Sequence, residues 1–203
     1  MEEVLNGKFH PIISLYRDTK EGSFPLILII GREPNDEMKM SDEVGEYNFD
    51  KKPVPFWNLP YDLLGSIINK TRKEFQDICR EKQSSPIAFA DISSCPIRSA
   101  SNDKQTIRKA FTTKDYIDHL RIIASKNVFK RVKLVVFSGL DYPNWAIKRF
   151  GDAVKEVSSE WREGGLTIFS ARFFTWRYKK EVEKSMQTVI SSDTTKAILE
   201  NWL

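Results

Sequence analysis

Apolar positions along the chain gather in four short runs that have the character of buried β-strands. The runs cover residues 24–30, 87–92, 132–138 and 166–170. The first three are nearly continuous rather than alternating with polar positions, which is typical of strands covered on both faces. The fourth follows Gly164 and Gly165, which indicate a turn. The pattern therefore predicts about four short, buried strands.

Segments with helical periodicity separate these runs. Apolar residues recur at three- and four-residue steps from Tyr61 onward, and this spacing predicts a helix that ends near Lys82. Similar spacing predicts helices over residues 113–130, with an N-cap type residue at Thr113, and over residues 143–157 and 179–190. The alternation of strands and helices predicts a three-layer α/β/α sandwich with a mostly parallel central sheet of about four strands. We expect one domain over residues 1–203, because no linker or repeat interrupts the pattern.

The composition is that of one folded domain. The chain has 203 residues, of which 40% are hydrophobic and 30% charged, which disfavours collagen-like, low-complexity and disordered classes. A net charge of +4 permits a polyanionic partner without requiring one. Two cysteines cannot form a disulfide framework, and Glu2 and Glu3 stand where a signal peptide would be basic. Because the longest apolar run is too short to span a bilayer, we expect a cytoplasmic protein without a membrane partner.

Polar residues directly follow the predicted strands, where open parallel sheets bind their ligands. The first strand leads into Gly31-Arg32-Glu33-Pro34-Asn35. Gly31 allows a ligand to approach the backbone closely, and Pro34 restricts the chain around Glu33. A carboxylate in this turn could activate a water molecule or stabilise a cationic sugar during glycosidic cleavage. The alternative interpretation is a turn whose charged side chains are only solvated.

Asp91 lies in an otherwise apolar strand, where a carboxylate needs a hydrogen-bonding partner. It could read the edge of a planar ligand such as a nucleobase, or it could cap the amides of the following loop. Ser93 could supply a further polar contact. Cys95 is interpreted as a small buried residue rather than a nucleophile, because no histidine is near it in the sequence.

Arginine and aromatic residues gather after the fourth strand. Arg172, Trp176 and Arg177 follow Ser170, the last residue of that run. Arginine binds phosphate and aromatic rings stack on unpaired bases, so the cluster suits single-stranded or locally opened nucleic acid. In the alternative interpretation, the aromatic rings anchor the last helix in the core.

A second aromatic pair, Phe56 and Trp57, lies between Pro55 and Pro60. The two prolines predict a loop around these rings. One of the rings could stack on a ligand, or both could plug the core.

The order of these motifs resembles the uracil-DNA glycosylase superfamily over most of the chain. Gly31-Arg32-Glu33-Pro34 is similar to the superfamily's first motif, a strand followed by Gly-x-x-Pro, and places Glu33 where some members have a water-positioning residue. Asp91 resembles the strand-end Asn that reads the edge of uracil. Phe56 and Trp57 lie where members carry a base-stacking ring. The resemblance implies hydrolysis of an N-glycosidic bond without a metal or an organic cofactor.

Two positions depart from the superfamily's pattern. Members have a His-Pro-Ser type loop whose His stabilises the departing base anion, whereas this chain has Ser170-Ala171-Arg172 at the corresponding place. Arg172 could supply the positive charge instead. An ionised Asp91 can only accept hydrogen bonds, whereas uracil presents a carbonyl oxygen that needs a donor. A base with an exocyclic amino group would therefore suit an ionised Asp91, and uracil would require Asp91 to be protonated.

The leading hypothesis is a DNA or nucleobase glycosylase that hydrolyses the N-glycosidic bond of a modified or damaged base, with Glu33 and Arg172 as catalytic residues. The residues expected to bind the substrate are Gly31, Pro34, Asn35, Phe56, Trp57, Asp91, Ser93 and Ser170. Those expected to bind nucleic acid are Arg98, Arg172, Trp176 and Arg177. The expected partner is nucleic acid, DNA rather than RNA, or a nucleotide. The alternative is a non-catalytic member of the fold that binds nucleic acid, a nucleotide or a protein partner at the strand ends.

Overall fold

A computed structural model describes residues 13–14, 26–31, 45–46, 55–91, 112–124, 131–138, 144–161, 167–171 and 179–203. The strands within these ranges are β1 (Ile13–Ser14), β2 (Ile27–Gly31), β3 (Gly45–Glu46), β4 (Ile87–Asp91), β5 (Leu134–Ser138) and β6 (Thr167–Ala171). The helices are α1 (Pro55–Ile67), α2 (Arg72–Lys82), α4 (Thr113–Ala124), α5 (Asn144–Trp161), α6 (Lys179–Ile190) and α7 (Asp193–Trp202). The four predicted strands are therefore present as β2, β4, β5 and β6.

These four strands form the parallel centre of the sheet. The strand order is β3-β1-β4-β2-β5-β6, and β4, β2, β5 and β6 run in the same direction. The two-residue strand β1 pairs antiparallel with β4, and β3 pairs parallel with β1. A mostly parallel sheet built around four main strands is thereby confirmed.

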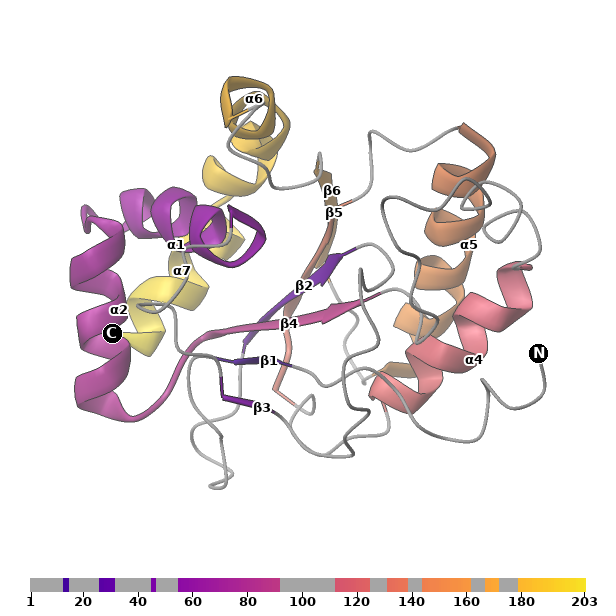
Figure 1. The fold of residues 1–203 in the computed structure, drawn as a ribbon, viewed down its shortest axis with the longest axis horizontal. Coiled ribbons are helices and arrows are strands. Elements are labelled where there is room, and N and C mark those ends of the chain that lie inside the picture. The colour runs from indigo at the N-terminus through magenta and orange to yellow at the C-terminus, as the bar shows by residue number, and fades with distance from the viewer. Residues whose placement is uncertain are drawn as a thin grey trace.

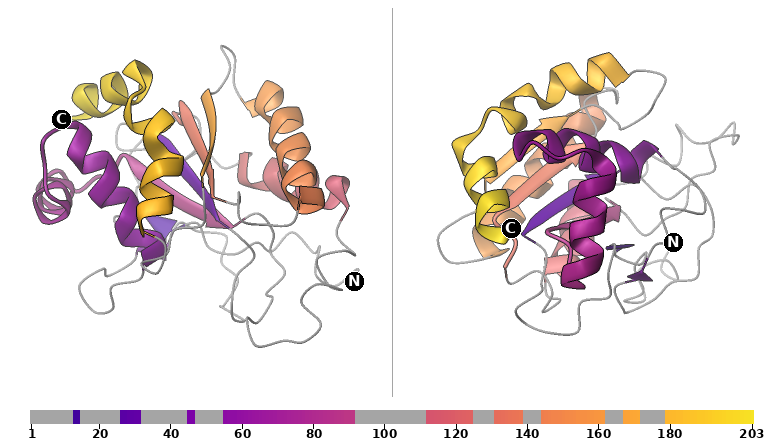
Figure 2. Two further views of the ribbon diagram at one scale, coloured as in Figure 1. Left: turned by 90° about the horizontal axis from the view of Figure 1, so that it is seen from above. Right: turned by 90° about the vertical axis from the view of Figure 1, so that its left-hand side faces the viewer.

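Helices cover both faces of the sheet, so the molecule has three layers (Figure 1). α1, α2, α6 and α7 lie on one face, and α4 and α5 lie on the other, as the further views also show (Figure 2). Ile27 and Ile29 of β2 belong to the core under α1, α2, α6 and α7. Leu28 and Ile30, which alternate with them along the strand, are equally buried. Because successive side chains of a strand point to opposite faces, this double burial explains the continuous apolar runs. The predicted α/β/α sandwich is confirmed.

The helical segment before β4 differs from the single helix that the apolar spacing predicts. The chain leaves α1 after Ile67, passes Asn69 at a φ of 54°, and starts α2 at Arg72. Thr71 is the N-cap of α2: its hydroxyl accepts from the Glu74 amide at 3.3 Å, while the Glu74 carboxylate accepts from the Thr71 amide at 2.8 Å. This capping box begins a new helix, which ends at Lys82 as predicted.

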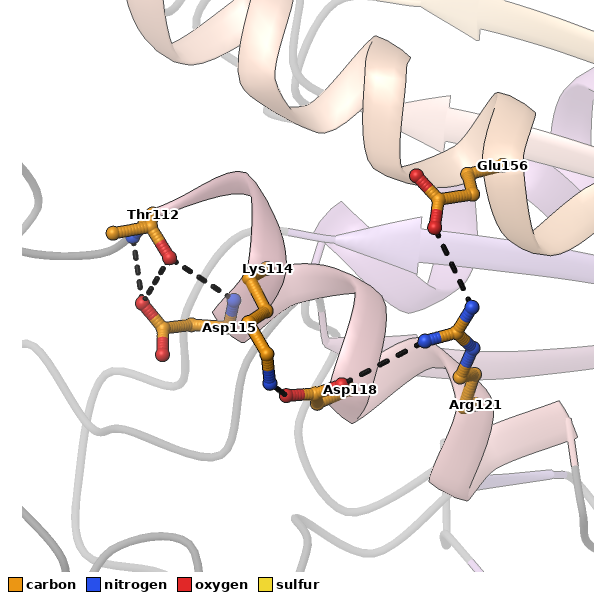
Figure 3. Close-up of polar contacts among 6 residues, drawn as sticks. All are labelled: Thr112, Lys114, Asp115, Asp118, Arg121 and Glu156. Carbon is orange, nitrogen blue, oxygen red and sulfur yellow. Dashed lines mark hydrogen bonds and ion pairs between the residues drawn. The ribbon is translucent and has the colours of Figure 1, made fainter.

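The layer formed by α4 and α5 is tied together by polar groups at its surface (Figure 3). Thr112, one residue before the predicted cap, caps α4 through Asp115, whose carboxylate accepts from the Thr112 amide at 2.7 Å. Arg121 lies 3.8 Å from Asp118 on its own helix and 3.4 Å from Glu156 on α5. All these contacts are exposed to solvent: those of Thr112 and Asp118 belong to α4 and its cap, and that of Arg121 with Glu156 joins the two helices, so we assign no chemistry to them.

Candidate functional site

The carboxyl ends of the four parallel strands form one edge of the sheet, and the strand register shows which residues meet there. Gly31 at the end of β2 pairs with Asp91 at the end of β4. Ser138 at the end of β5 pairs with Ala171 at the end of β6. Ile30 pairs with Phe137, so Gly31 and Ser138 occupy the next positions on neighbouring strands. The end row across the sheet is therefore Asp91, Gly31, Ser138 and Ala171.

The strand order identifies where along this edge a ligand would bind. From β2 the chain passes through α1 and α2 on one face and returns as β4 on one side of β2. The connections to β5 and β6 then pass through α4 and α5 on the other face and place those strands on the opposite side. In open α/β sheets, ligands bind in the crevice at the carboxyl ends of the two neighbouring strands from which the chain continues in opposite directions across the sheet. Here that position lies between Gly31 and Ser138.

Side-chain volume falls sharply at this edge. Two positions before the end row, and so on the same face of the sheet, Phe89, Ile29, Val136 and Phe169 are large apolar residues that lie in the core or pack against it. In the end row, Gly31 has no side chain, Ser138 and Ala171 have small ones, and both are fully buried. A glycine at the end of the central strand allows close approach to the backbone, as the sequence predicts for Gly31.

For several predicted site residues, the structure describes the position of the backbone but not that of the side chain. Asp91 and Ser170 lie in β4 and β6, so the backbone of Asp91 is at the edge and that of Ser170 is one position before it. The predicted loop around Phe56 and Trp57 is wrong, because Pro55–Ile67 is helix α1. Pro55 is tolerated as the first residue of a helix, and Pro60 removes only its own N–H, which would have bonded the Phe56 carbonyl.

The other predicted residues lie outside the described ranges. They are Glu33, Pro34, Asn35, Ser93, Arg98, Arg172, Trp176 and Arg177. For two of these residues, the length of the covalent chain limits the distance from the edge. Glu33 follows Gly31 by two residues, so their Cα atoms are at most roughly 7 Å apart, and Arg172 directly follows Ala171 with about 3.8 Å between Cα atoms.

Sequence reasoning missed a buried pair of amides at the start of α1. Gln76 on α2 donates to the Asn58 side-chain oxygen at 3.3 Å, and the two side chains are only 6% and 2% exposed. This bond fixes the first turn of α1 against α2, and with it the backbone of Trp57. In the sequence, Asn58 stands between two aromatic residues and two apolar ones. Hydrophobic periodicity alone does not show whether such a segment is a helix or a loop.

Sequence reasoning also missed a shallow groove between α1 and α6, with a volume of about 410 Å³. Its floor and walls come from Asp62, Leu63, Ser66, Lys179, Glu183, Gln187 and Ile190. Lys179 lies 3.6 Å from Glu183 within the groove, and Asp62 lies 3.7 Å from Arg72 beside it. Each of these carboxylates therefore has a cationic neighbour, and the groove favours neither anions nor cations.

The shifted pKa values of the described residues arise from helix caps and surface ion pairs. Hydrogen bonds from the Thr71 amide and hydroxyl lower the pKa of Glu74, with a smaller contribution from Lys70. The Asp118 carboxylate raises the pKa of Lys114, first by its hydrogen bond and then by its charge. Both groups are on helices rather than at the strand ends, so neither shift indicates a catalytic group.

One histidine and the two cysteines of the chain are buried in the fold or lie outside the described ranges. His119 is 5% exposed within α4, and Cys79 is fully buried in the core, while Cys95 is outside the described ranges. Among the described residues, no group of three or more His, Cys, Asp or Glu side chains is placed to hold a metal ion. None of the described helices is long and apolar enough to cross a membrane.

Comparison with known proteins adds no assignment to this geometry. No protein-family model matches the chain. No curated protein matches it either.

Proposed function

We propose that the chain is a glycosylase that hydrolyses the N-glycosidic bond of a modified or damaged nucleic-acid base at the carboxyl edge of its sheet. The observation that carries this proposal is the register of β4, β2 and β6. Gly31 lies beside Asp91, and Ala171 lies two strands from Gly31. The segments that bear Glu33 and Arg172 therefore leave the sheet at the edge where Asp91 ends β4.

The distances between these strands suit a ligand of nucleotide size. Adjacent strands lie about 4.8 Å apart, so Gly31 is roughly 5 Å from Asp91 and roughly 10 Å from Ala171. A base held over Gly31 would have Asp91 on one side and the segment of Arg172 on the other. Glu33 would approach from the turn that follows Gly31.

The reaction assigns one role to each of these side chains. Glu33 accepts a proton from water, the water oxygen bonds to C1′ of the sugar, and the C1′–N bond breaks with its electron pair passing to the base. Arg172 stabilises the anionic base as it leaves, and the base then takes up a proton. Asp91 accepts a hydrogen bond from an exocyclic amino group of the base. Phe56 or Trp57 stacks on the extruded base.

The proposed substrate is DNA rather than RNA or a free nucleotide, and the proposed setting is the cytoplasm. A base in a duplex must be flipped out of the stack, which costs about a few kcal/mol. Contacts of Arg98, Arg172 and Arg177 with phosphates and of Trp176 with a base would offset that cost. The chain's net charge of +4 is compatible with such a polyanionic partner.

A base-release screen tests the proposal. Single- and double-stranded oligonucleotides carrying uracil, hypoxanthine, xanthine and alkylated bases are incubated with the chain, and free base is measured. We expect release of at least one base, and a loss of about 10²–10⁴-fold on Glu33→Gln. Glu81→Gln on the exposed surface of α2 is the matched control and should retain full activity. Release that is unaffected by Glu33→Gln would contradict the assigned role.

The second candidate is a non-catalytic member of the fold that binds nucleic acid at the same edge. The absence of a His from residues 170–173 favours it, because the superfamily's leaving-group residue is a His. This candidate predicts that oligonucleotides bind with a steep loss of affinity at rising salt, as phosphate contacts require. It also predicts no base release, and an affinity that Glu33→Gln leaves unchanged.

A further inference from the structure

Helix α6 contains two lysines whose surroundings differ from those of other lysines in the described helices. In four places, a lysine forms an ion pair with a carboxylate four residues further along its helix. These pairs are Lys114–Asp118, Lys148–Asp152, Lys179–Glu183 and Lys196–Glu200. Lys180 instead has a second lysine, Lys184, at that position. Like charges four residues apart on a helix repel each other and destabilise the helix.

Lys180 and Lys184, which we call the lysine pair, are both exposed. Neither forms an ion pair within the described part of the chain, although Glu181 is their neighbour in the sequence. Lys180 also lies in the first turn of α6, where the dipole of the helix disfavours a cation. The two charges therefore lower the stability of the chain on its own, and an anionic partner would compensate for them.

The lysine pair lies on the helix that follows the carboxyl edge of the sheet. β6 ends at that edge with Ala171, and α6 begins at Lys179 and packs against β6. Figures 1 and 2 show that α6 begins near the carboxyl end of β6. Side chains four residues apart on a helix have Cβ atoms about 5–6 Å apart. The lysine pair is therefore a short positive patch beside the proposed site.

We propose that the lysine pair binds phosphates of a single-stranded or locally opened nucleic acid whose target base lies at the carboxyl edge of the sheet. The identity of this anion rests on the proposed function. Lysine binds phosphate as a point charge. Contacts with phosphates fix the position of a strand on a protein and carry no sequence information. The lysine pair would thus hold the strand while residues at the edge contact the base.

The test is the affinity of the full chain for a fluorescent single-stranded oligonucleotide, measured by anisotropy at a series of salt concentrations. The α6 variant, Lys180→Gln combined with Lys184→Gln, removes both charges. We expect its affinity to fall about 10-fold at about 0.1 M salt. The slope of log K against log salt concentration should become shallower by about 1.4, because each phosphate contact of a single strand contributes about 0.7. The loss should be similar for oligonucleotides of different sequence.

The matched control combines Lys133→Gln with Lys196→Gln. Both lysines are exposed, but Lys133 precedes β5 at the opposite edge of the sheet and Lys196 lies on α7. Each double variant lowers the net charge from +4 to 4 − 2 = +2, so an effect of overall charge would weaken binding equally in both. We expect the control to keep the slope of the unmodified chain. Equal losses in the two variants would overturn the inference.

Thermal unfolding tests the premise that the lysine pair opposes stability. The unfolding midpoint of the α6 variant should be no lower than that of the unmodified chain, because the substitutions remove a like-charge repulsion and glutamine has a similar helix propensity. A lower midpoint would contradict the premise, because it would assign the two lysines a role in the fold itself.

Base release separates this inference from the proposed function. If the unmodified chain releases a base and the α6 variant binds as tightly as the control, only the role of the lysine pair falls. If no base is released but binding depends on the lysine pair, the glycosylase falls and the phosphate site stands. If the unmodified chain binds no oligonucleotide, both fall. Tighter binding of poly-glutamate, lost in the α6 variant, would indicate an acidic protein and overturn the assignment to nucleic acid.

Discussion

The hydroxyl groups of Tyr61 on α1 and Ser85 before β4 lie 2.7 Å apart in a buried hydrogen bond. The Ser85 hydroxyl donates to the Ile87 carbonyl at 3.0 Å, so the Tyr61 hydroxyl is the donor in this bond. Ser85 also accepts from the Ile87 amide at 3.1 Å. One serine thereby fixes the start of β4 and connects it with the helix layer above.

This geometry predicts that Ser85→Ala destabilises the chain more than Tyr61→Phe. Tyr61→Phe removes one hydrogen bond but keeps the buried ring, and should cost about 1 kcal/mol. Ser85→Ala removes the partner of the buried Tyr61 hydroxyl and of the Ile87 amide, and should cost about 1–3 kcal/mol. Urea unfolding at constant m-value measures both changes. The reverse order would show that the network does not stabilise the fold as described.

Gly65 is predicted to be intolerant of any side chain. A Cβ atom there would lie 2.9 Å from the Lys70 carbonyl oxygen and 3.3 Å from a ring carbon of Phe75. We expect Gly65→Ala to destabilise the chain by about 1–3 kcal/mol, despite alanine's better helix propensity. Gly151→Ala in α5 is the matched control. A Cβ atom at Gly151 meets no atom within 4 Å, so this substitution should stabilise by about 0.5–1 kcal/mol. Thermal unfolding of the two variants should shift in opposite directions.

Glu74 is predicted to make the stability of the chain depend on pH. The pKa of Glu74 is lower in the folded chain than its ordinary value. Its contribution to the free energy of unfolding is therefore present at pH values above the ordinary pKa of a glutamate, and it is lost as the pH falls through the pKa of the folded chain. Glu74→Gln should therefore be less stable than the unmodified chain near neutral pH. The difference should shrink on acidification, as measured by urea unfolding across a pH series. A difference that stays constant with pH would contradict the capping role of the carboxylate.

Thr195→Val is predicted to stabilise the chain. Thr195 is fully buried on α7, and its hydroxyl oxygen has no hydrogen-bond partner among the residues that the structure describes. Valine has nearly the same shape without the hydroxyl, so the substitution removes a desolvation cost of about 1 kcal/mol. A higher midpoint of thermal unfolding is expected. A loss of stability would indicate that the hydroxyl has a partner elsewhere in the chain.

The four main strands were predictable because burial on both faces leaves a continuous apolar run, as in β2 and β5. The break between α1 and α2 was not predicted, because Ile68 and Phe75 keep the helical spacing of apolar residues across it. The deciding signals were the capping box of Thr71 and Glu74 and the positive φ of Asn69. The strands β1 and β3 have only two residues each, too few for any period to be visible.

The candidate site was predictable to the extent that it depends on topology. Strand ends in a parallel sheet share an edge, so the presence of Gly31 and Asp91 at one edge follows from the alternation of strands and helices, whereas their direct pairing depends on the strand order. The amide pair of Asn58 and Gln76 and the groove between α1 and α6 depend on which helix faces meet. That choice is made by packing between segments distant in sequence, for which hydrophobic periodicity gives no signal.

The most direct measurement is the mapping of bound nucleic acid by amide chemical shifts. Isotope-labelled Glu33→Gln chain, in which turnover is blocked, is titrated with a single-stranded oligonucleotide carrying a base released in the screen, or hypoxanthine if none is released. A site at the carboxyl edge predicts shifts concentrated at Gly31, Asp91, Ser138 and Ala171, with none at Ser85 or Gly151. Shifts confined to the groove of Ser66 and Gln187, or no shifts at all, would contradict it.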